Sequence, residues 1–582
     1  MFRYLLFSFI VFSLINSSGN AQGNVDQRKI DSEFKRAVEL FDTQQYDDAL
    51  LGFEKIINEY EVNSKTTASY FFKIKILIEE KHYAEASSAI SFFIENYPNS
   101  KYTDEIRILL VKIQLDNFEY SDALKELATL IDQSKSILYR VEAKVLGEKI
   151  ADNYLNSSSI KRLNDLFTSE KVKPYLLLLL AKSFLKEHQK GNALSTLSQI
   201  TINYTSSEEY TEANNLYHNP VMPDKIEGGT SLIAVLLPLQ YDATGNYTST
   251  AAGEILDGIK FAVSEFNRFR EDKIGIVIRD TRNDEEQINT IRNELGNNAD
   301  IKAMLGPVFS NEVRVALKTF DGTDLPIISP TATDNDLTSI SEDFFQANPP
   351  IAIRGKIMAQ YVYFVENKRS MAVLNAIDGY SPLLAATFAD EFEKLGGTIT
   401  VKATYKSNSF SLSEPITEIE YAGNVEGIYI PLANKIDATA ILSQLGQDSI
   451  YLPIYGNQDW FSAKGFESSP ELSNMLTFSS DYFIDFNDEE FKDFGSRFSK
   501  MTGKDPNRNV LYGYDAAKYI LTVMRNIVAS RSGIKNKMIS GMISTGLHNN
   551  ISFDENRMNR YLNIVRYKDG VFELIEKFRS GN

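Results

Sequence analysis

The chain has 582 residues, a formal net charge of −17, four histidines and no cysteine. Its length exceeds that of one ordinary domain, and 43% apolar with 24% charged residues is a globular composition. The acidic balance argues against a nucleic-acid or anionic-membrane surface, since both require clustered Lys and Arg. The lack of Cys excludes disulfides and thiolate ligands, and the histidines lie far apart. We therefore expect no metal site, no cofactor and no lipid anchor.

Residues 1–21 have the features of a cleavable export signal. Arg3 supplies a positive charge, Leu5 to Ile15 form an apolar run, and Gly19-Asn20-Ala21 offers small residues for cleavage. A membrane-spanning helix needs about 20 apolar residues, so this run is too short to be one. We expect an exported protein of the periplasm or cell envelope.

Residues 26–217 show a helical pattern with internal repetition. Three segments align at a spacing of 37 residues. The positions in register are Tyr46, Tyr83 and Tyr120, then Ala49, Ala86 and Ala123, then Phe53, Ile90 and Leu127. This order of aromatic, small and large apolar residues resembles the tetratricopeptide repeat family, most clearly over residues 34–132. Stacked repeats form a concave surface that can hold a partner protein or peptide, and a rigid spacer is the alternative.

A linker is predicted at residues 218–230, which contain two prolines and a Gly pair. The hydrophobic period then changes. Ser231 to Pro238 is a continuous apolar run, typical of a strand buried on both faces. Strands alternating with helices follow to residue 577 and predict two α/β lobes with doubly wound parallel sheets. The fold class is thus an all-α repeat array followed by a two-lobed α/β domain.

The stretch from residue 303 to 338 predicts half of a small-molecule cleft. A buried strand, Ala303 to Leu305, precedes a turn that carries Ser310, and a helix leads to a second strand, Leu325 to Ile328. The loop 329–334 is rich in small hydroxyl residues. In parallel sheets, ligands bind beyond the carboxyl ends of strands, where these two loops would meet.

The region 231–577 resembles the type I periplasmic solute-binding fold, in the branch of the branched-chain amino acid binding proteins. The matching stretches include IAVLLPLQ, MLGPVFSNEV, LPIISPTATDNDLT and AIDGYSPLLAATFADEFEKLGGTI. The resemblance implies a first lobe at 231–345 and 480–545, and a second at 346–479 and 546–577. It also implies three crossings between the lobes and closure of the lobes on a ligand.

The resemblance also implies a set of ligand-binding residues. They are Ser310, Thr331, Ala332 and Thr333 in the first lobe, and Tyr380, Gln458 and Asp459 in the second. Hydroxyls suit the carboxylate of an amino acid, and Tyr380 would stack on the ligand. Gln458 occupies the position of the acidic group that pairs with a ligand amine, with Asp459 one residue later. Trp460, the only tryptophan, either replaces a missing stacking surface or belongs to the core.

Two functions remain open, and neither is enzymatic, because no P-loop, GxSxG elbow or HExxH motif is present. The first is a receptor that captures a small polar, amino-acid-like ligand for a membrane transporter of the ABC type, with repeats that dock a partner protein. The second follows from a domain order similar to that of the lipoprotein activators of penicillin-binding proteins. It implies a cell-envelope interaction protein that regulates peptidoglycan synthesis by a cell-wall synthase, with a degenerate solute site.

Overall fold

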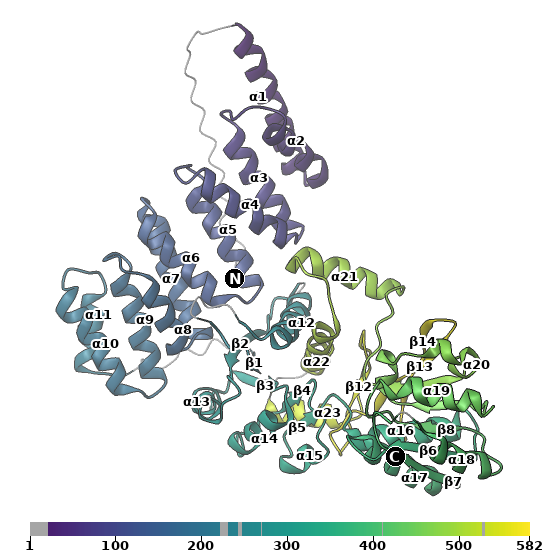
Figure 1. The fold of residues 1–582 in the computed structure, drawn as a ribbon. Coiled ribbons are helices and arrows are strands. Elements are labelled where there is room, and N and C mark those ends of the chain that lie inside the picture. Colours follow the sequence, from purple (N-terminus) through teal and green to yellow (C-terminus); the bar gives the residue numbers. More distant parts are fainter. Residues whose placement is uncertain are drawn as a thin grey trace. The chain divides into compact units, whose positions relative to one another are not determined.

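The computed structural model describes residues 21–221, 231–242, 247–268, 270–409, 411–525 and 530–581 (Figure 1). The predicted export signal therefore lies outside the described residues except at its last position, and so does most of the predicted linker. The chain divides into two compact units, residues 1–113 and 114–582. Within the described ranges, none of the helices has the length and apolar character to cross a membrane.

The first unit consists of antiparallel helices. They are α1 (Ala21–Asp42), α2 (Tyr46–Asn58), α3 (Thr66–Glu79), α4 (Tyr83–Asn96) and most of α5 (Thr103–Asp116). On α2, Ala49 and Phe53 are spaced four residues apart and are fully buried. The Phe53 ring stacks on Phe72 of α3 with ring centroids 5.0 Å apart. The repeated small and aromatic positions thus form the contacts between neighbouring helices.

The second unit begins with the remaining helices of the array. They are α6 (Tyr120–Gln133), α7 (Ile137–Tyr154), α8 (Ser157–Leu166), α9 (Lys173–Lys186), α10 (Lys190–Asn203) and α11 (Tyr210–His218). Ala123 and Leu127 of α6 are fully buried, as the repeat register predicts. Helix α8 begins after Asn156, whose side chain accepts a hydrogen bond from the Ser159 N–H at 3.0 Å. An all-helical, repeat-like region therefore precedes the α/β domain.

The first α/β lobe is built on a parallel five-stranded sheet in the order β2-β1-β3-β4-β5. The strands are β1 (Leu232–Leu237), β2 (Gly275–Asp280), β3 (Ile301–Leu305), β4 (Ile327–Ser329) and β5 (Phe344–Gln346). All residues of β1 are buried, because helices cover both faces of a central parallel strand. The helices of this lobe are α12 (Thr250–Asn267), α13 (Glu285–Leu295), α14 (Ser310–Thr319), α15 (Leu337–Ile340), α21 (Glu489–Thr502), α22 (Arg508–Met524) and α23 (Arg531–Ile539).

The second lobe is built on a seven-stranded sheet in the order β14-β13-β10-β9-β8-β6-β7. Its parallel strands are β6 (Ser370–Ala376), β7 (Thr398–Tyr405), β8 (Ile428–Ile430), β9 (Ile454–Gly456) and β10 (Leu476–Ser480). An antiparallel hairpin, β13 (Tyr561–Lys568) and β14 (Val571–Arg579), completes one edge. The helices are α16 (Ile351–Phe364), α17 (Ser381–Lys394), α18 (Ser413–Tyr421), α19 (Asp437–Gln447) and α20 (Pro470–Ser473). The predicted fold class is confirmed.

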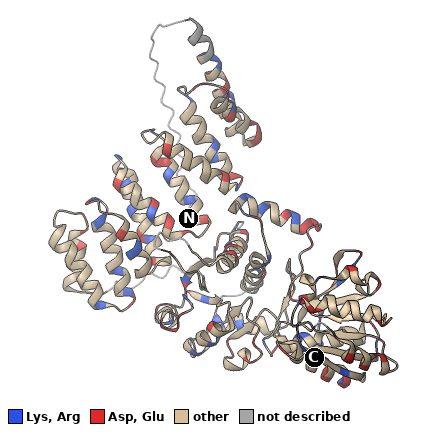
Figure 2. Ribbon diagram, viewed as in Figure 1, with Lys and Arg blue, Asp and Glu red and all other residues tan. Residues whose placement is uncertain are grey.

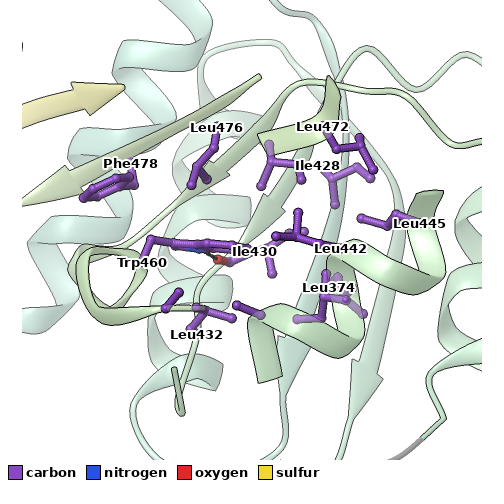
Figure 3. Close-up of a cluster of buried hydrophobic side chains, with 14 of the residues drawn as sticks. Leu374, Ile428, Ile430, Leu432, Leu442, Leu445, Trp460, Leu472, Leu476 and Phe478 are labelled. Carbon is purple, nitrogen blue, oxygen red and sulfur yellow. Dashed lines mark hydrogen bonds between the residues drawn. The ribbon is translucent and has the colours of Figure 1, made fainter. Parts of the chain in front are cut away.

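Trp460 belongs to the core of the second lobe. It is fully buried beside Leu442 and Leu476, and its indole N–H donates to the Ile430 carbonyl at 3.0 Å (Figure 3). A buried indole needs such a partner, because an unsatisfied N–H costs free energy. Of the two roles that the sequence left open, Trp460 therefore has the core role.

Helices α12 and α22 cross at two glycines. A Cβ on Gly258 would lie 1.9 Å from the Val510 carbonyl oxygen, and one on Gly513 would lie 2.0 Å from that of Ile255. Only glycine allows the two backbones to approach so closely. The crossing fixes the first turns of both helices, which lie at the edge of the first lobe that faces the second.

The chain passes between the lobes after β5, after β10 and after the short pair β11 (Ile543–Ser544) and β12 (Ile551–Ser552). The crossing segments bind one another. The Gln346 N–H donates to the Arg557 carbonyl, and the Asn559 N–H donates to the Gln346 carbonyl, both at 2.9 Å. Three bonded crossings of this kind can act as a hinge between two rigid lobes.

Candidate functional site

A cavity of about 540 Å³ lies between the two lobes, beyond the carboxyl ends of their strands. The first lobe contributes Ala251, Ala252, Ile255, Val308, Phe309, Thr331, Thr333, Arg508, Asn509 and Tyr512. The second contributes Ile351, Arg354, Tyr380, Leu384, Asn457, Gln458 and Ser479, and the segments that cross between the lobes contribute Asn348 and Asp481. Its volume is typical of a small-molecule site, and its position is the one expected for open α/β sheets.

In the first lobe, the predicted site residues divide into two groups. Thr331 and Thr333 line the cavity. Ser310 is not among the lining residues; its hydroxyl oxygen accepts from the N–H groups of Thr333 at 3.2 Å and Asp334 at 3.3 Å. Ala332 is buried, and its N–H donates to Ser329 Oγ at 3.3 Å. Ser310 and Ala332 thus shape the loop that presents Thr333, and their direct contact with a ligand stays a prediction.

In the second lobe, Tyr380 lines the cavity, and Asp459 supports it. The Tyr380 hydroxyl donates to the Asp459 carboxylate, which also accepts from Asn457 Nδ2 at 2.9 Å. Burial raises the pKa of the Asp459 carboxyl, and the bonds from Tyr380 and Asn457 oppose this rise. The carboxylate therefore orients the tyrosine ring at the cavity wall.

Gln458 also lines the cavity, and its orientation is set by Arg354. Its Oε1 accepts from Arg354 Nη1 at 2.7 Å. The amide nitrogen is then the group left for a ligand, and an amide nitrogen can only donate. This arrangement suits a ligand carboxylate better than the ligand amine that the resemblance assigns to this position.

A buried ion pair between Arg354 and Asp481 lies at the cavity wall, and the sequence analysis did not find it. Arg354 Nη2 donates to Asp481 Oδ2 at 3.0 Å and to Asn348 Oδ1 at 2.9 Å, while Nε donates to the Pro349 carbonyl at 3.0 Å. Burial opposes ionisation of Asp481, but the charge of Arg354, the hydrogen bond from Asn348 and the charge of Arg508 hold its pKa below the ordinary value. The pair connects the first and second crossings between the lobes.

Arg508 is a second cavity residue that the sequence analysis missed. Its guanidinium lies 4.8 Å from the ring centroid of Tyr482 and 5.7 Å from that of Tyr512. Within the described part of the chain, it forms no ion pair with a carboxylate. As the first residue of α22, it also stands at the positive end of the helix dipole, which disfavours a cation. A positive charge in that position, facing a cavity, is suited to bind an anion.

The charges around the cavity differ in sign from the charge of the chain. Acidic and basic residues are spread along the ribbon (Figure 2), and the total is −17. The charged lining residues are Arg354, Arg508 and Asp481, two positive charges against one negative charge. Asp481 forms its ion pair with Arg354 and attracts Arg508 at longer range, so one positive charge of the lining is left for a ligand.

The missed residues have weak signals in the sequence. Arg354 is the first charged residue of an otherwise largely apolar helix that follows Pro349-Pro350. Arg508 follows Asn507, the N-cap of α22, and so lies in the first turn of the helix. Acidic residues are preferred in a first turn, so an arginine there is unusual. Asp481 follows the end of a buried strand.

Among the residues described, no group of three or more His, Asp or Glu side chains could hold a metal ion.

The chain belongs to the periplasmic binding protein family, whose model matches residues 234–571. A solved structure described as a branched-chain amino acid ABC transporter from Rhodospirillum rubrum is 21% identical, with a TM-score of 0.53; the match covers 59% of this chain and 99% of that one. An ABC transporter substrate-binding protein from Desulfitobacterium hafniense in complex with Leu is 21% identical, with a TM-score of 0.43, and covers 59% of this chain and 99% of its own. No curated protein matches the sequence. At this identity the first likeness establishes the fold alone.

Proposed function

We propose that this protein is an exported solute-binding receptor whose interlobe cleft captures a small polar ligand with a carboxylate group, as an amino acid has. The observation that carries the proposal is the charge of the cavity lining. Arg508 faces the cavity without a carboxylate partner, while the one lining carboxylate, Asp481, is paired with Arg354. The chain carries a large negative net charge, so the excess of positive charge at this cavity is a local feature, and binding of an anionic ligand group would explain it.

The remaining lining groups fit the same ligand. The Thr333 hydroxyl and the Gln458 amide can donate to a carboxylate, and the Tyr380 ring offers a surface for an apolar part of the ligand. Closure of the lobes at the bonded crossings would exclude water from the site. Excluding water strengthens a charge-assisted bond to Arg508, because screening falls with the local dielectric constant.

The lining also predicts which ligand groups matter. Among the described residues, Asp481 is the one carboxylate that lines the cavity, and it already forms an ion pair with Arg354. A ligand ammonium would therefore gain less binding free energy in the cavity than a ligand carboxylate. Removing the carboxylate should therefore cost far more affinity than removing the amine.

A partner protein on the helical array is a further part of the proposal. Large apolar side chains of α7, namely Ile137, Leu138, Val141 and Val145, are all more than half exposed. Exposed apolar side chains on one helix are suited to a protein contact. In this scheme a membrane transporter receives the solute, and the array binds the partner that brings the receptor to it.

The second candidate is a non-enzymatic interaction protein of the cell envelope that regulates peptidoglycan synthesis. One observation favours it. Arg279 of β2 donates from Nη1 to the Tyr154 carbonyl of α7 at 2.9 Å, which fixes part of the array to the first lobe. This part of the array and the lobe belong to one compact unit of the chain, as a scaffold protein requires.

Thermal unfolding with matched ligands separates the two candidates. The protein is melted with leucine, with leucinamide, which lacks the carboxylate, and with 4-methylpentanoate, which lacks the amine, and equivalent sets are made from other amino acids. A ligand at 100 times its Kd adds about 2.7 kcal/mol to the free energy of unfolding. We expect the carboxylates of at least one set to raise the melting temperature and the amide to have little effect. No shift with any set, together with direct binding of a purified peptidoglycan synthase, would support the second candidate instead.

A further inference from the structure

A second cavity, of about 480 Å³, lies at the junction between the helical array and the first lobe, and we call it the junction cavity. The array contributes the start of α6 and the end of α7 with α8, and the lobe contributes the end of β2 and one side of α12. Its walls share no residue with those of the interlobe cleft. It is therefore a separate site, with a volume in the range of small-molecule sites.

The walls of the junction cavity are held together by specific contacts. Tyr154 of α7 stacks on Tyr120 of α6, with ring centroids 4.0 Å apart and ring planes within 1°. Arg279, which bonds the Tyr154 carbonyl, is itself buried and bonded to both oxygens of Glu294. Tyr154 also packs against the core of the first lobe. The cavity is thus built into a packed interface within the second unit of the chain.

A cation on one wall lacks a counter-ion. The guanidinium of Arg162, on α8, lies 5.0 Å from the ring centroid of Tyr241. Its one hydrogen bond to a described residue is a long one, 3.5 Å, to Ser159 Oγ, and none of the described carboxylates forms an ion pair with it. The Arg162 side chain is half-buried, and this burial lowers its pKa. An anionic group would restore the lost hydration.

Two carboxylates on the same cavity also lack partners. The side chains of Glu119 and Asp122, at the start of α6, form no hydrogen bond or ion pair with a described residue. Burial raises the pKa of Glu119, although Lys260 opposes the rise, while Asp122 is exposed to solvent. The third lining carboxylate, Asp280, is occupied, because it accepts from the N–H groups of Gln240 and Arg282. Lys125 and Lys260 also line the cavity, where Lys260 favours the charged form of both carboxylates and Lys125 that of Asp122. Neither lysine forms an ion pair with Glu119 or Asp122, so both carboxylates remain available to a cationic group of a ligand.

The lining also contains apolar side chains, beside hydroxyl and amide groups. Leu155, Leu163, Leu256 and Ile278 all contribute to the wall. A ligand with a positive group, a negative group and an apolar part matches these three kinds of lining residue. A short peptide with free termini has all three, and its size suits the cavity volume better than that of a single amino acid.

We propose that the junction cavity binds a short zwitterionic peptide, whose carboxylate pairs with Arg162 and whose ammonium pairs with Glu119 and Asp122. This site does not depend on the function proposed for the interlobe cleft. A solute could occupy the cleft whether or not a peptide occupies the junction.

The test is calorimetric titration of the full-length exported protein with the tripeptide Ala-Phe-Ala in three forms: free, N-acetylated and C-amidated. We expect saturable binding of the free peptide and at least tenfold weaker binding of each blocked form, since each loses one charge-assisted bond. R162Q should weaken the free peptide by about tenfold or more and leave the amide unaffected. E119Q should likewise weaken binding of the free peptide by about tenfold or more and leave binding of the N-acetylated peptide unaffected.

The matched control is K161Q, which removes a charge from the neighbouring exposed position of α8 that does not line the cavity. Its affinity for the free peptide should equal that of the unmodified protein. Absence of binding by all three peptide forms at millimolar concentration would overturn the proposal. So would binding of the free peptide that R162Q and E119Q leave unchanged.

Discussion

The interlobe cleft and the junction cavity have similar volumes but different arrangements of charge. In the cleft, the buried charges Arg354 and Asp481 form an ion pair, and a single exposed cation, Arg508, has no ion pair. In the junction cavity, the buried Arg279 is paired with Glu294 and bonds the Tyr154 carbonyl. Three further charged groups of that lining, Arg162, Glu119 and Asp122, form no ion pair with a described residue. The comparison teaches that a buried ion pair supports each site, and that the junction cavity leaves charges of both signs unpaired whereas the cleft leaves one cation.

The variant D481A tests most strongly whether the buried ion pair stabilises the cleft. It leaves Arg354 buried without its counter-ion, and removal of one partner from a buried pair typically costs about 3–5 kcal/mol. We expect a loss of that size in the free energy of unfolding, measured by urea denaturation. A loss below about 1 kcal/mol would show that the pair does not hold the crossings.

The control for that variant is D336A, which breaks the exposed contact between Asp336 and Arg314 at 2.6 Å. Exposed pairs contribute little to stability because water and salt screen them. This control should therefore change the free energy of unfolding much less than D481A does. Equal losses for the two variants would contradict the difference in burial.

The wall of the cleft on the first lobe depends on the close crossing of α12 and α22. In G513A, the new Cβ would meet the Ile255 carbonyl oxygen at 2.0 Å, so the helices must separate. Overpacking of this kind costs about 1–3 kcal/mol. The measurement is again urea denaturation. The control is G191A, because a Cβ on Gly191 would meet only open space, and we expect it to leave the free energy of unfolding nearly unchanged. Gly541 also has open space but a positive φ of 78°, so G541A would add backbone strain and is not a suitable control.

The pH dependence of stability sharpens the comparison further. The pKa of Asp481 is held below its ordinary value, so its contribution is present above about pH 4, the range of an unfolded Asp, and is lost as the pH falls through the folded value. The stability difference between the unmodified protein and D481N should therefore shrink in acid. A difference that stays constant from pH 7 to pH 2 would contradict the assignment.

The smallest expected effect belongs to the junction cavity. The pKa of Glu119 is raised by burial, so its charged form costs stability above its folded pKa and that cost disappears as the pH falls. E119Q removes the cost, and we expect the free energy of unfolding at pH 7 to be unchanged or slightly higher, within about 0.5 kcal/mol. A clear loss of stability at pH 7 would mean that Glu119 has a partner that stabilises the fold.

Local patterns made much of the fold predictable. The spacing of Ala49 and Phe53 marked a helix face that is buried in the structure, and the apolar run in β1 marked a central parallel strand. These elements follow from hydrophobic periodicity, which each short segment carries by itself. The hairpin of β13 and β14, in contrast, adds two antiparallel strands to the edge of a parallel sheet, a pairing that periodicity does not specify.

The candidate site was predictable from the hydroxyl-rich loop 329–334 and from the family resemblance. The loop drew attention to Thr331 and Thr333, and the resemblance implied Tyr380 and Gln458; all four line the cleft, and their contact with a ligand stays a prediction. The pairing of Arg354 with Asp481 joins residues 127 positions apart, and only the fold brings them together. Gln458 illustrates the same limit, since its orientation depends on Arg354 and not on its neighbours in the sequence.

The central claim is that Arg508 binds a ligand carboxylate in the cleft. The most direct test is the Kd of the strongest stabiliser from the thermal screen, measured by calorimetry for the unmodified protein, for R508Q and for K500Q. Lys500 is exposed at the end of α21 and does not line the cleft, so K500Q controls for the loss of one positive charge. We predict that R508Q raises the Kd by about tenfold or more while K500Q leaves it unchanged. Equal affinities for all three proteins would contradict the account.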